Sequence, residues 1–341
     1  MRKGWTTGAC AAAAARGAAL FLQAGSWPDC VTIRLPKGVE ASFPLAERKS
    51  GPGWAEAGVV KDAGDDPDVT HGTLVLARLE PGQPGSGLIF KAGEGVGTAT
   101  LPGLPIAVGE AAITPGPRDQ IARNLASFGS DFVVTLSIPG GAELAKKTMN
   151  ARLGVMGGLS ILGTTGVVTP YSNAAWIGAI HRGIDVALAN GVAHIAAATG
   201  AASECAARNH HGLSEMALID IGGFAGAFLK YVKRHPFARV TLAGGFAKIG
   251  KLAAGNLDLH SKKSSVDIAF LSGFLPEGER RERGLKAVTA AQLLELAGDF
   301  PLADAVASKA LDVAQGILGR TDISMDILVV DRGGKVIGHA L

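Results

Sequence analysis

The chain has 341 residues, of which 47% are hydrophobic, 5% aromatic and 18% charged, with a formal net charge of +3. This length is sufficient for two domains, and the small positive charge, without any run of basic residues, argues against a dedicated nucleic-acid-binding protein. No stretch reaches the roughly 18–20 consecutive apolar residues that cross a bilayer, so we expect no membrane-spanning segment.

The first residues are not expected to form a secretory leader. Arg16 interrupts the apolar run that begins at Ala11, and Thr6-Thr7-Gly8 lies where the hydrophobic part of a leader would begin. The three cysteines are odd in number, widely spaced and surrounded by apolar residues. This pattern predicts reduced, buried thiols in a cytoplasmic protein, at Cys10, Cys30 and Cys205.

Residues 1–125 predict an α+β domain with an antiparallel or mixed sheet. An alanine-rich helix is expected at 7–23, ended by Gly25. Short apolar segments follow, separated by turns that contain glycine or proline. We expect strands at 30–35, 41–45, 56–61, 73–79 and 88–91.

Residues 126–341 predict a Rossmann-like α/β domain that ends in helices and a hairpin. Strands and helices alternate here, and glycine-containing turns open the helices that follow the strands at 194–198, 216–221 and 239–243. This repetition is typical of a doubly wound sheet with a ligand along its carboxyl edge. Further strands are expected at 132–138, 159–162, 267–271 and 327–330, helices at 287–297 and 302–318, and a last hairpin strand at 335–340.

A short turn, Gly163-Thr164-Thr165-Gly166, follows the apolar segment 159–162. Glycines and threonines at the end of a buried strand let backbone N–H groups face a ligand. A tight connecting turn without any ligand explains the same residues equally well.

The sequence predicts no metal site. No cysteine or histidine pair shows the spacing of zinc ligands. We therefore interpret His181, His210 and His211 as surface groups.

Four segments in succession resemble the cobalt-precorrin-5B carbon-1 methyltransferase (CbiD-like) family of cobalamin biosynthesis. They are GWTTGACAAAAARGAA near the start, Gly93 to Arg118, IPGGAELAKKTMNARLGVMGGLSILGTTGVV, and Lys248 to Ser265. The resemblance implies S-adenosylmethionine as the methyl donor and a tetrapyrrole, the partly built corrin macrocycle, as the acceptor. It also implies an α+β part followed by a Rossmann-like part.

Methyl transfer of this kind needs alignment of two centres in a dry site more than acid–base groups. We expect the turns at the strand ends to hold the donor, namely Gly163, Thr164, Thr165, Gly166, Thr199, Gly200, Ser203 and Glu204. For Glu204, stabilisation of the first turn of a helix is an equal alternative.

The acceptor carries many carboxylates, so its site needs cations and free N–H groups. The candidates are Thr6, Thr7 and Gly8 at a helix start, with Arg118, Lys147 and Lys248. Each basic residue is otherwise a solvated surface charge. His260 is the candidate catalytic histidine, for a polar contact with substrate or a proton relay, and capping is its alternative role.

Two other functions use the same features. A non-catalytic carrier of the tetrapyrrole would need the basic rim without the donor turns. A phosphate- or nucleotide-binding enzyme would use the glycine turns, but the chain has neither a GxxxxGK[ST] loop nor a strand-flanked GxGxxG motif. A homodimer remains an option that the sequence does not decide.

Overall fold

The computed structural model describes all 341 residues, and their packing divides the chain into two compact units, Met1–Ser172 and Asn173–Leu341. The predicted boundary between residues 125 and 126 differs from this division. The reason is β9 (Phe132–Ser137), which pairs antiparallel with β6 (Leu74–Pro81) and parallel with β7 (Leu88–Ala92). The strand that we expected to open the second domain therefore completes the sheet of the first unit.

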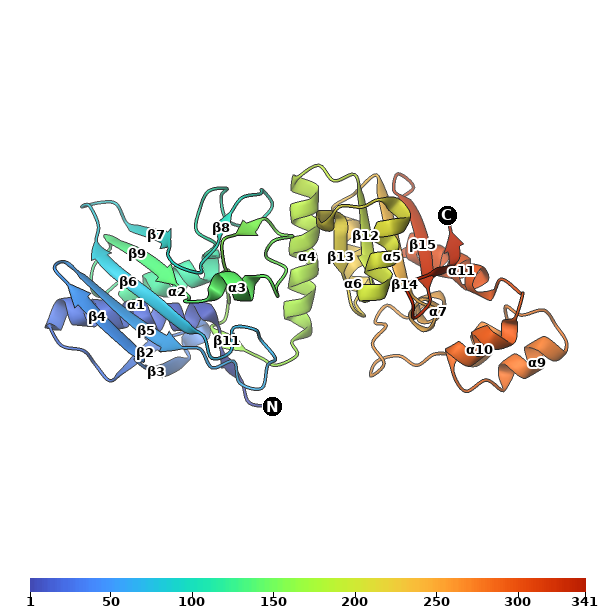
Figure 1. Cartoon of the computed structure of the whole chain (residues 1–341), viewed down its shortest axis with the longest axis horizontal. Helices are drawn as coiled ribbons and strands as arrows, with labels where there is room; N and C mark the ends of the chain where they lie inside the picture. The colour runs from blue at the N-terminus through green and yellow to red at the C-terminus, as the bar shows by residue number, and fades with distance from the viewer. The chain divides into compact units, whose positions relative to one another are not determined.

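The first unit contains a five-stranded sheet with the order β4-β5-β6-β9-β7. Helix α1 (Thr7–Ala24) packs on this sheet and on α2 (Pro115–Leu125) (Figure 1). The other elements of this unit are β1 (Gly4–Trp5), β2 (Cys30–Arg34), β3 (Glu40–Pro44), β4 (Glu47–Gly51), β5 (Trp54–Val60), β8 (Thr98–Ala99), α3 (Gly141–Ala145), β10 (Val155–Met156) and β11 (Val167–Val168). The expected strands between residues 30 and 92 are present, and β4 is an additional strand whose polar sequence ERKSG carries no strand signal.

Helix α1 lies in the core of the first unit. Every residue from Thr7 to Ala15 is buried, and most of them are alanines, whose small side chains let the helix approach the sheet closely. The side chain of Thr6 accepts a hydrogen bond from the amide of Ala9 and begins the helix. Gly25 ends it with a left-handed backbone (φ 73°), which confirms the predicted stop.

The second unit is built on a five-stranded sheet with the order β13-β12-β14-β15-β16. The first four strands are parallel and the last is antiparallel. The strands are β12 (His194–Ala198), β13 (Leu218–Asp220), β14 (Arg239–Gly245), β15 (Ser324–Val330) and β16 (Val336–Ala340). The helices are α4 (Asn173–Ala189), α5 (Ala201–His211), α6 (Ala225–Val232), α7 (Phe246–Ala253), α8 (Ile268–Ser272), α9 (Glu279–Leu285), α10 (Ala290–Ala297) and α11 (Leu302–Leu318).

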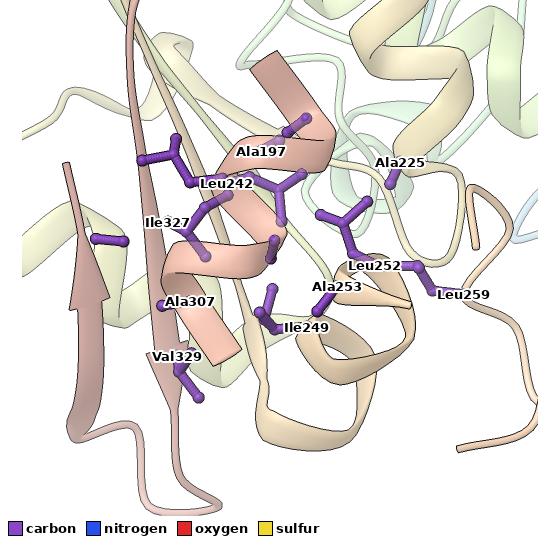
Figure 2. Close-up of a cluster of buried hydrophobic side chains, with 14 of the residues drawn as sticks. Ala197, Ala225, Leu242, Ile249, Leu252, Ala253, Leu259, Ala307, Ile327 and Val329 are labelled. Atoms are coloured by element: carbon purple, nitrogen blue, oxygen red, sulfur yellow. The ribbon is translucent and has the colours of Figure 1, made fainter. Parts of the chain in front are cut away.

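Helices cover both faces of this second sheet. Helix α5 packs on one face, over a small apolar cluster that includes Ala196, Ala243 and Leu328. The opposite face carries the main core of the unit. Figure 2 shows part of that core, where Ile249 of α7 and Ala307 of α11 lie beside Leu242 and other strand residues. Because both faces are covered, the central strands β12, β14 and β15 are buried along nearly their whole length.

Three sequence-based expectations differ from the structure. The expected strand at 267–271 is wrong, because the Asp267 side chain accepts from the amide of Phe270 and begins helix α8. The expected strand at 159–162 is reduced to isolated bridges at Leu159 and Ile161. Of the three cysteines only Cys10 is buried, whereas Cys30 and Cys205 are exposed. None of the helices combines the length and the apolar character needed to cross a membrane.

Candidate functional site

A cleft of the second unit opens at the carboxyl edge of its sheet. From β12 the chain passes through α5 to β13 on one side, and then through α6 to β14 on the other side. The strand order thus reverses between β12 and β14, and ligands of open α/β sheets bind at such a reversal. A cleft of about 1050 Å³ lies there, lined by residues that follow both strands.

The β12–α5 junction supplies one wall of the cleft, through Thr199, Gly200 and Ser203. The Ser203 hydroxyl donates to the carbonyl of Gly200 (2.8 Å) and accepts from the amide of Thr199 (3.1 Å), which fixes the turn. A Cβ atom on Gly200 would meet no other atom within 4 Å, so this glycine faces open space. The first amides of α5 lie directly behind it, where a helix attracts polar or anionic groups.

The β14–α7 junction supplies the next wall, through Gly245, Phe246 and Lys248. The Lys248 ammonium donates to the carbonyl oxygens of Thr199 and, over 3.3 Å, of Gly222. Burial lowers the pKa of this ammonium. The sequence predicts that Lys248 binds the acceptor. In the structure its side chain instead holds the turn that begins at Thr199, which is a predicted donor-binding turn.

Residues from the C-terminal part of the chain complete the cleft, and sequence analysis missed them. Asp331 and Arg332 follow β15, and Thr289 and Glu295 belong to the start and body of α10. The Asp331 Oδ1 atom accepts from the amides of Gly333 and Lys335 and so shapes the turn to β16. Asp331 and Arg332 come directly after a buried parallel strand in the sequence. That position predicts that they lie at the same edge of the sheet as Thr199, and it could have identified them.

The chemical character of the cleft is amphiphilic. Apolar side chains such as Phe246, Val266 and Leu294 lie beside a few charged groups at the rim. No histidine or cysteine lines it. Such a site binds a mixed polar and apolar molecule and holds it in position, rather than activating a nucleophile of its own.

The predicted donor residues do not form one site on one sheet. Gly163, Thr164, Thr165 and Gly166 belong to the first unit, whereas Thr199, Gly200, Ser203 and Glu204 belong to the second. Gly163 has φ 125°, and a Cβ atom there would lie 2.3 Å from the Cβ atom of Thr6. The glycine is therefore explained by close packing against the start of α1. The side chains of Thr164 and Thr165 are exposed.

The amides of Thr6 and Gly8 at the start of α1 donate to the carbonyls of Gly166 and Leu162 and are not free. Thr6 and Thr7 are buried. The Thr7 hydroxyl contacts both the amide and the carbonyl of Leu162. These three residues join α1 to the segment at 162–166, and the amides of Thr6 and Gly8 are not the free donors that were predicted.

The remaining site candidates lie apart from the cleft lining. In the first unit Arg118 is held by Glu110 (2.7 Å) and by the carbonyl of Ile113, whereas Lys147 is exposed. In the second unit Glu204 lies in the first turn of α5, 3.9 Å from Arg208, and does not line the cleft. His260 is exposed beside Gly223, where its ring accepts from the amide of Lys262.

Comparison with known proteins gives a family match in the first unit and relatives that match over nearly the whole chain. A family model described as CbiD matches residues 1–170. The cobalt-precorrin-5B C(1)-methyltransferase of Paramagnetospirillum magneticum is 52% identical over 350 residues, which cover 100% of this chain and 98% of that protein. The protein of the same name from Rhodospirillum rubrum is 51% identical and covers 99% of this chain and 97% of its own length.

One solved structure also resembles the chain. It is a crystal structure of the cobalamin biosynthesis protein (cbiD) from Archaeoglobus fulgidus, which is 29% identical. The alignment covers 77% of this chain and 83% of that chain, with a TM-score of 0.42.

Proposed function

Because the chain belongs to the CbiD family and methylates carbon 1 of cobalt-precorrin-5B, we propose that it binds the methyl donor S-adenosylmethionine in the cleft of the second unit. The observation that carries this proposal is the position of the cleft at the strand reversal between β12 and β14. We regard the second unit as Rossmann-like on the same ground.

The charges of the cleft suit this donor. S-adenosylmethionine carries a positive sulfonium, an ammonium, a carboxylate and an apolar purine. Asp331 and Glu295 complement the positive groups, and the first amides of α5 complement the carboxylate. Phe246 and Leu294 offer apolar surface to the purine. Thr199 and Ser203 remain donor-site residues in this proposal, with Lys248 as a positioning residue.

The chain's own contribution to the reaction is binding, alignment and exclusion of water. The acceptor carbon attacks the methyl group in line with the sulfonium, and the sulfur leaves as a neutral thioether with the electron pair of the broken bond. The methylated macrocycle then loses one proton to solvent, which removes the positive charge that the methyl group brought. Alignment of the two centres supplies several kcal/mol of the barrier reduction. This mechanism needs no histidine or cysteine in the cleft.

For the acceptor we propose cationic and hydroxyl side chains that reach solvent. In the first unit these are Lys147, Thr164 and Thr165, which are exposed. His260, exposed in the second unit, stays a separate candidate for a proton relay. Arg118 already has a carboxylate partner in Glu110, which makes it a weaker candidate. The macrocycle's carboxylates would favour Lys147 most, because no carboxylate of the chain pairs with its ammonium.

The donor proposal is tested with Gly200→Val and the matched control Gly316→Val. Gly200 faces the cleft, whereas Gly316 is exposed on α11. At both positions no other atom of the protein lies within 4 Å of an added Cβ atom. We expect both variants to fold, and only Gly200→Val to lose at least about tenfold in affinity for S-adenosylmethionine by titration calorimetry, because its side chain fills the cleft. Equal affinity in the two variants would place the donor elsewhere. A wild-type chain that binds the macrocycle but not the donor would instead support a carrier.

A further inference from the structure

Four of the eight histidines gather on the α5 face of the second unit's sheet, away from the cleft. His194 is the first residue of β12, His210 and His211 end α5, and His339 belongs to β16. The ring of His211 lies 4.7 Å from that of His194 and 4.6 Å from that of His210. The interpretation of His211 as a surface group is wrong, since its side chain is only 8% exposed.

A fully buried carboxylate, that of Asp326 in β15, lies among these rings. Its Oδ1 atom accepts from the Thr241 hydroxyl (2.8 Å) and from Arg239 Nε (3.1 Å). Its Oδ2 atom faces imidazoles instead, with His211 Nε2 at 2.9 Å and His339 Nε2 at 3.5 Å. One oxygen is therefore oriented by the protein, and the other is directed at ring nitrogens.

The same cluster contains an unsatisfied polar atom. The Nε2 atom of His339 is buried and has no hydrogen-bond partner. Buried polar atoms nearly always have a partner, so an exception needs an explanation. A ligand held between His339 and Asp326 would provide one.

We propose that His194, His211 and Asp326 bind a divalent metal ion of the zinc type, with His339 as the fourth ligand. One ligand atom from each of the first three residues lies within 4.8 Å of the other two. Around a tetrahedral zinc ion, ligand atoms at about 2.0–2.2 Å from the metal lie roughly 3.3–3.5 Å from each other. Metal binding would therefore draw the more distant ligand atoms together from separations of up to 4.8 Å.

The chemistry of the donor set favours this class of metal. Several imidazoles with one carboxylate suit Zn²⁺, Co²⁺ or Ni²⁺, whereas Ca²⁺ and Mg²⁺ prefer oxygen ligands. Thr241 and Arg239 would act as the outer partners that orient the carboxylate, although the positive charge of Arg239 opposes the cation.

The ion would join elements that are distant in sequence. Its ligands come from β12, from the end of α5, from β15 and from β16. The start of α5 lines the cleft, so a metal at its other end would hold the whole helix against the sheet. We therefore expect bound metal to stabilise the second unit against unfolding.

The test uses the full chain without a polyhistidine tag, stripped with a chelator and then loaded with Zn²⁺ or Co²⁺. We expect one zinc per chain after gel filtration and the visible absorption bands of four-coordinate Co²⁺. His211→Gln and His339→Gln should each weaken zinc binding by at least about 10–100-fold, the loss seen when even an outer partner is removed. His181→Gln and His235→Gln, whose rings stack on Tyr231 outside the cluster, are the matched controls.

Absence of stoichiometric zinc and of the cobalt bands in the wild-type chain would overturn the proposal. So would wild-type affinity in both His211→Gln and His339→Gln, or an equal loss in the controls. If His211→Gln does not fold, two measurements still decide the question: zinc binding by His339→Gln, which changes the edge strand β16, and the cobalt spectrum of the wild-type chain. None of these measurements depends on methyl transfer, so they are independent of the donor site.

Discussion

The ammonium of Lys248 donates a hydrogen bond to the backbone carbonyl of Thr199, and so joins the start of α7 to the end of β12. The two residues lie on either side of the point where the strand order reverses. One side chain therefore connects the two junctions that line the cleft.

Replacing Lys248 by methionine should weaken donor binding. The carbonyls of Thr199 and Gly222 would lose their donor, and a hydrogen bond to a charged group contributes about 1.5–3 kcal/mol. We expect a loss of about tenfold or more in affinity for S-adenosylmethionine, measured by titration calorimetry. The control is Lys230→Met, at an exposed position of α6. Lys251→Met is unsuitable as a control, because Lys251 is buried. If only macrocycle binding suffers in Lys248→Met, the assignment to the donor half is wrong.

Replacing Asp331 by asparagine should reduce affinity for S-adenosylmethionine more than for S-adenosylhomocysteine. The asparagine oxygen can still accept from the amides of Gly333 and Lys335, so the turn is kept while the charge is lost. A surface charge a few ångströms from a sulfonium contributes on the order of 1 kcal/mol. Calorimetry with both ligands measures the difference, and an equal change for the charged and the neutral ligand contradicts the proposed role.

Replacing Gly163 by valine should destabilise the first unit by several kcal/mol. The new side chain would collide with Thr6, and the backbone has φ 125°, which only glycine adopts without strain. Gly109→Val is the control, because Gly109 also has a positive φ (90°) but no atom within 4 Å of its Cβ position. Thermal unfolding should show a much larger fall in Tm for Gly163→Val. Similar falls in Tm for the two variants would mean that the contact between residue 163 and Thr6 contributes little to stability.

Replacing Asp68 by asparagine should lower the stability of the first unit at neutral pH. Asp68 pairs at 2.7 Å with Lys61, whose side chain is only 1% exposed, and breaking a buried pair costs about 3–5 kcal/mol. Asp29→Asn is the control, because Asp29 pairs with Arg48 while 97% exposed, and such pairs contribute little.

The same pair predicts how this effect depends on pH. Burial by itself raises the pKa of Asp68, but the hydrogen bond and charge of Lys61 outweigh it and lower the pKa. A lowered carboxyl pKa gives stability that is fully present above the unfolded value of about 3.9 and is lost as the pH falls through the folded value. The difference between wild type and Asp68→Asn in denaturant unfolding should therefore narrow below about pH 4. If the difference in free energy of unfolding between the two proteins stayed constant below about pH 4, the charge of Asp68 would not be what stabilises the buried Lys61.

Sequence reasoning was accurate where local signals dominate. The helix that starts after Thr6 and stops at Gly25, and the parallel strands that end at Ala198 and Gly245, depend on caps, turns and apolar runs that the sequence states directly. It was inaccurate for the segment after Asp267, where a single capping side chain outweighs the β-branched residues beside it. The family blocks were recognisable, because they depend on residue identity alone.

The sequence by itself determined the family, the glycine-rich strand ends and the alanine-rich helix, since each follows from neighbours in the chain. Only the tertiary structure decided that β9 completes the first sheet, that Gly163 packs on Thr6 and that Asp331 shares a cleft with Thr199. It also brought His194, His211 and Asp326 together. The physical reason is that strand pairing and burial join residues far apart in the chain, and local patterns carry no information about which distant partner a strand will take.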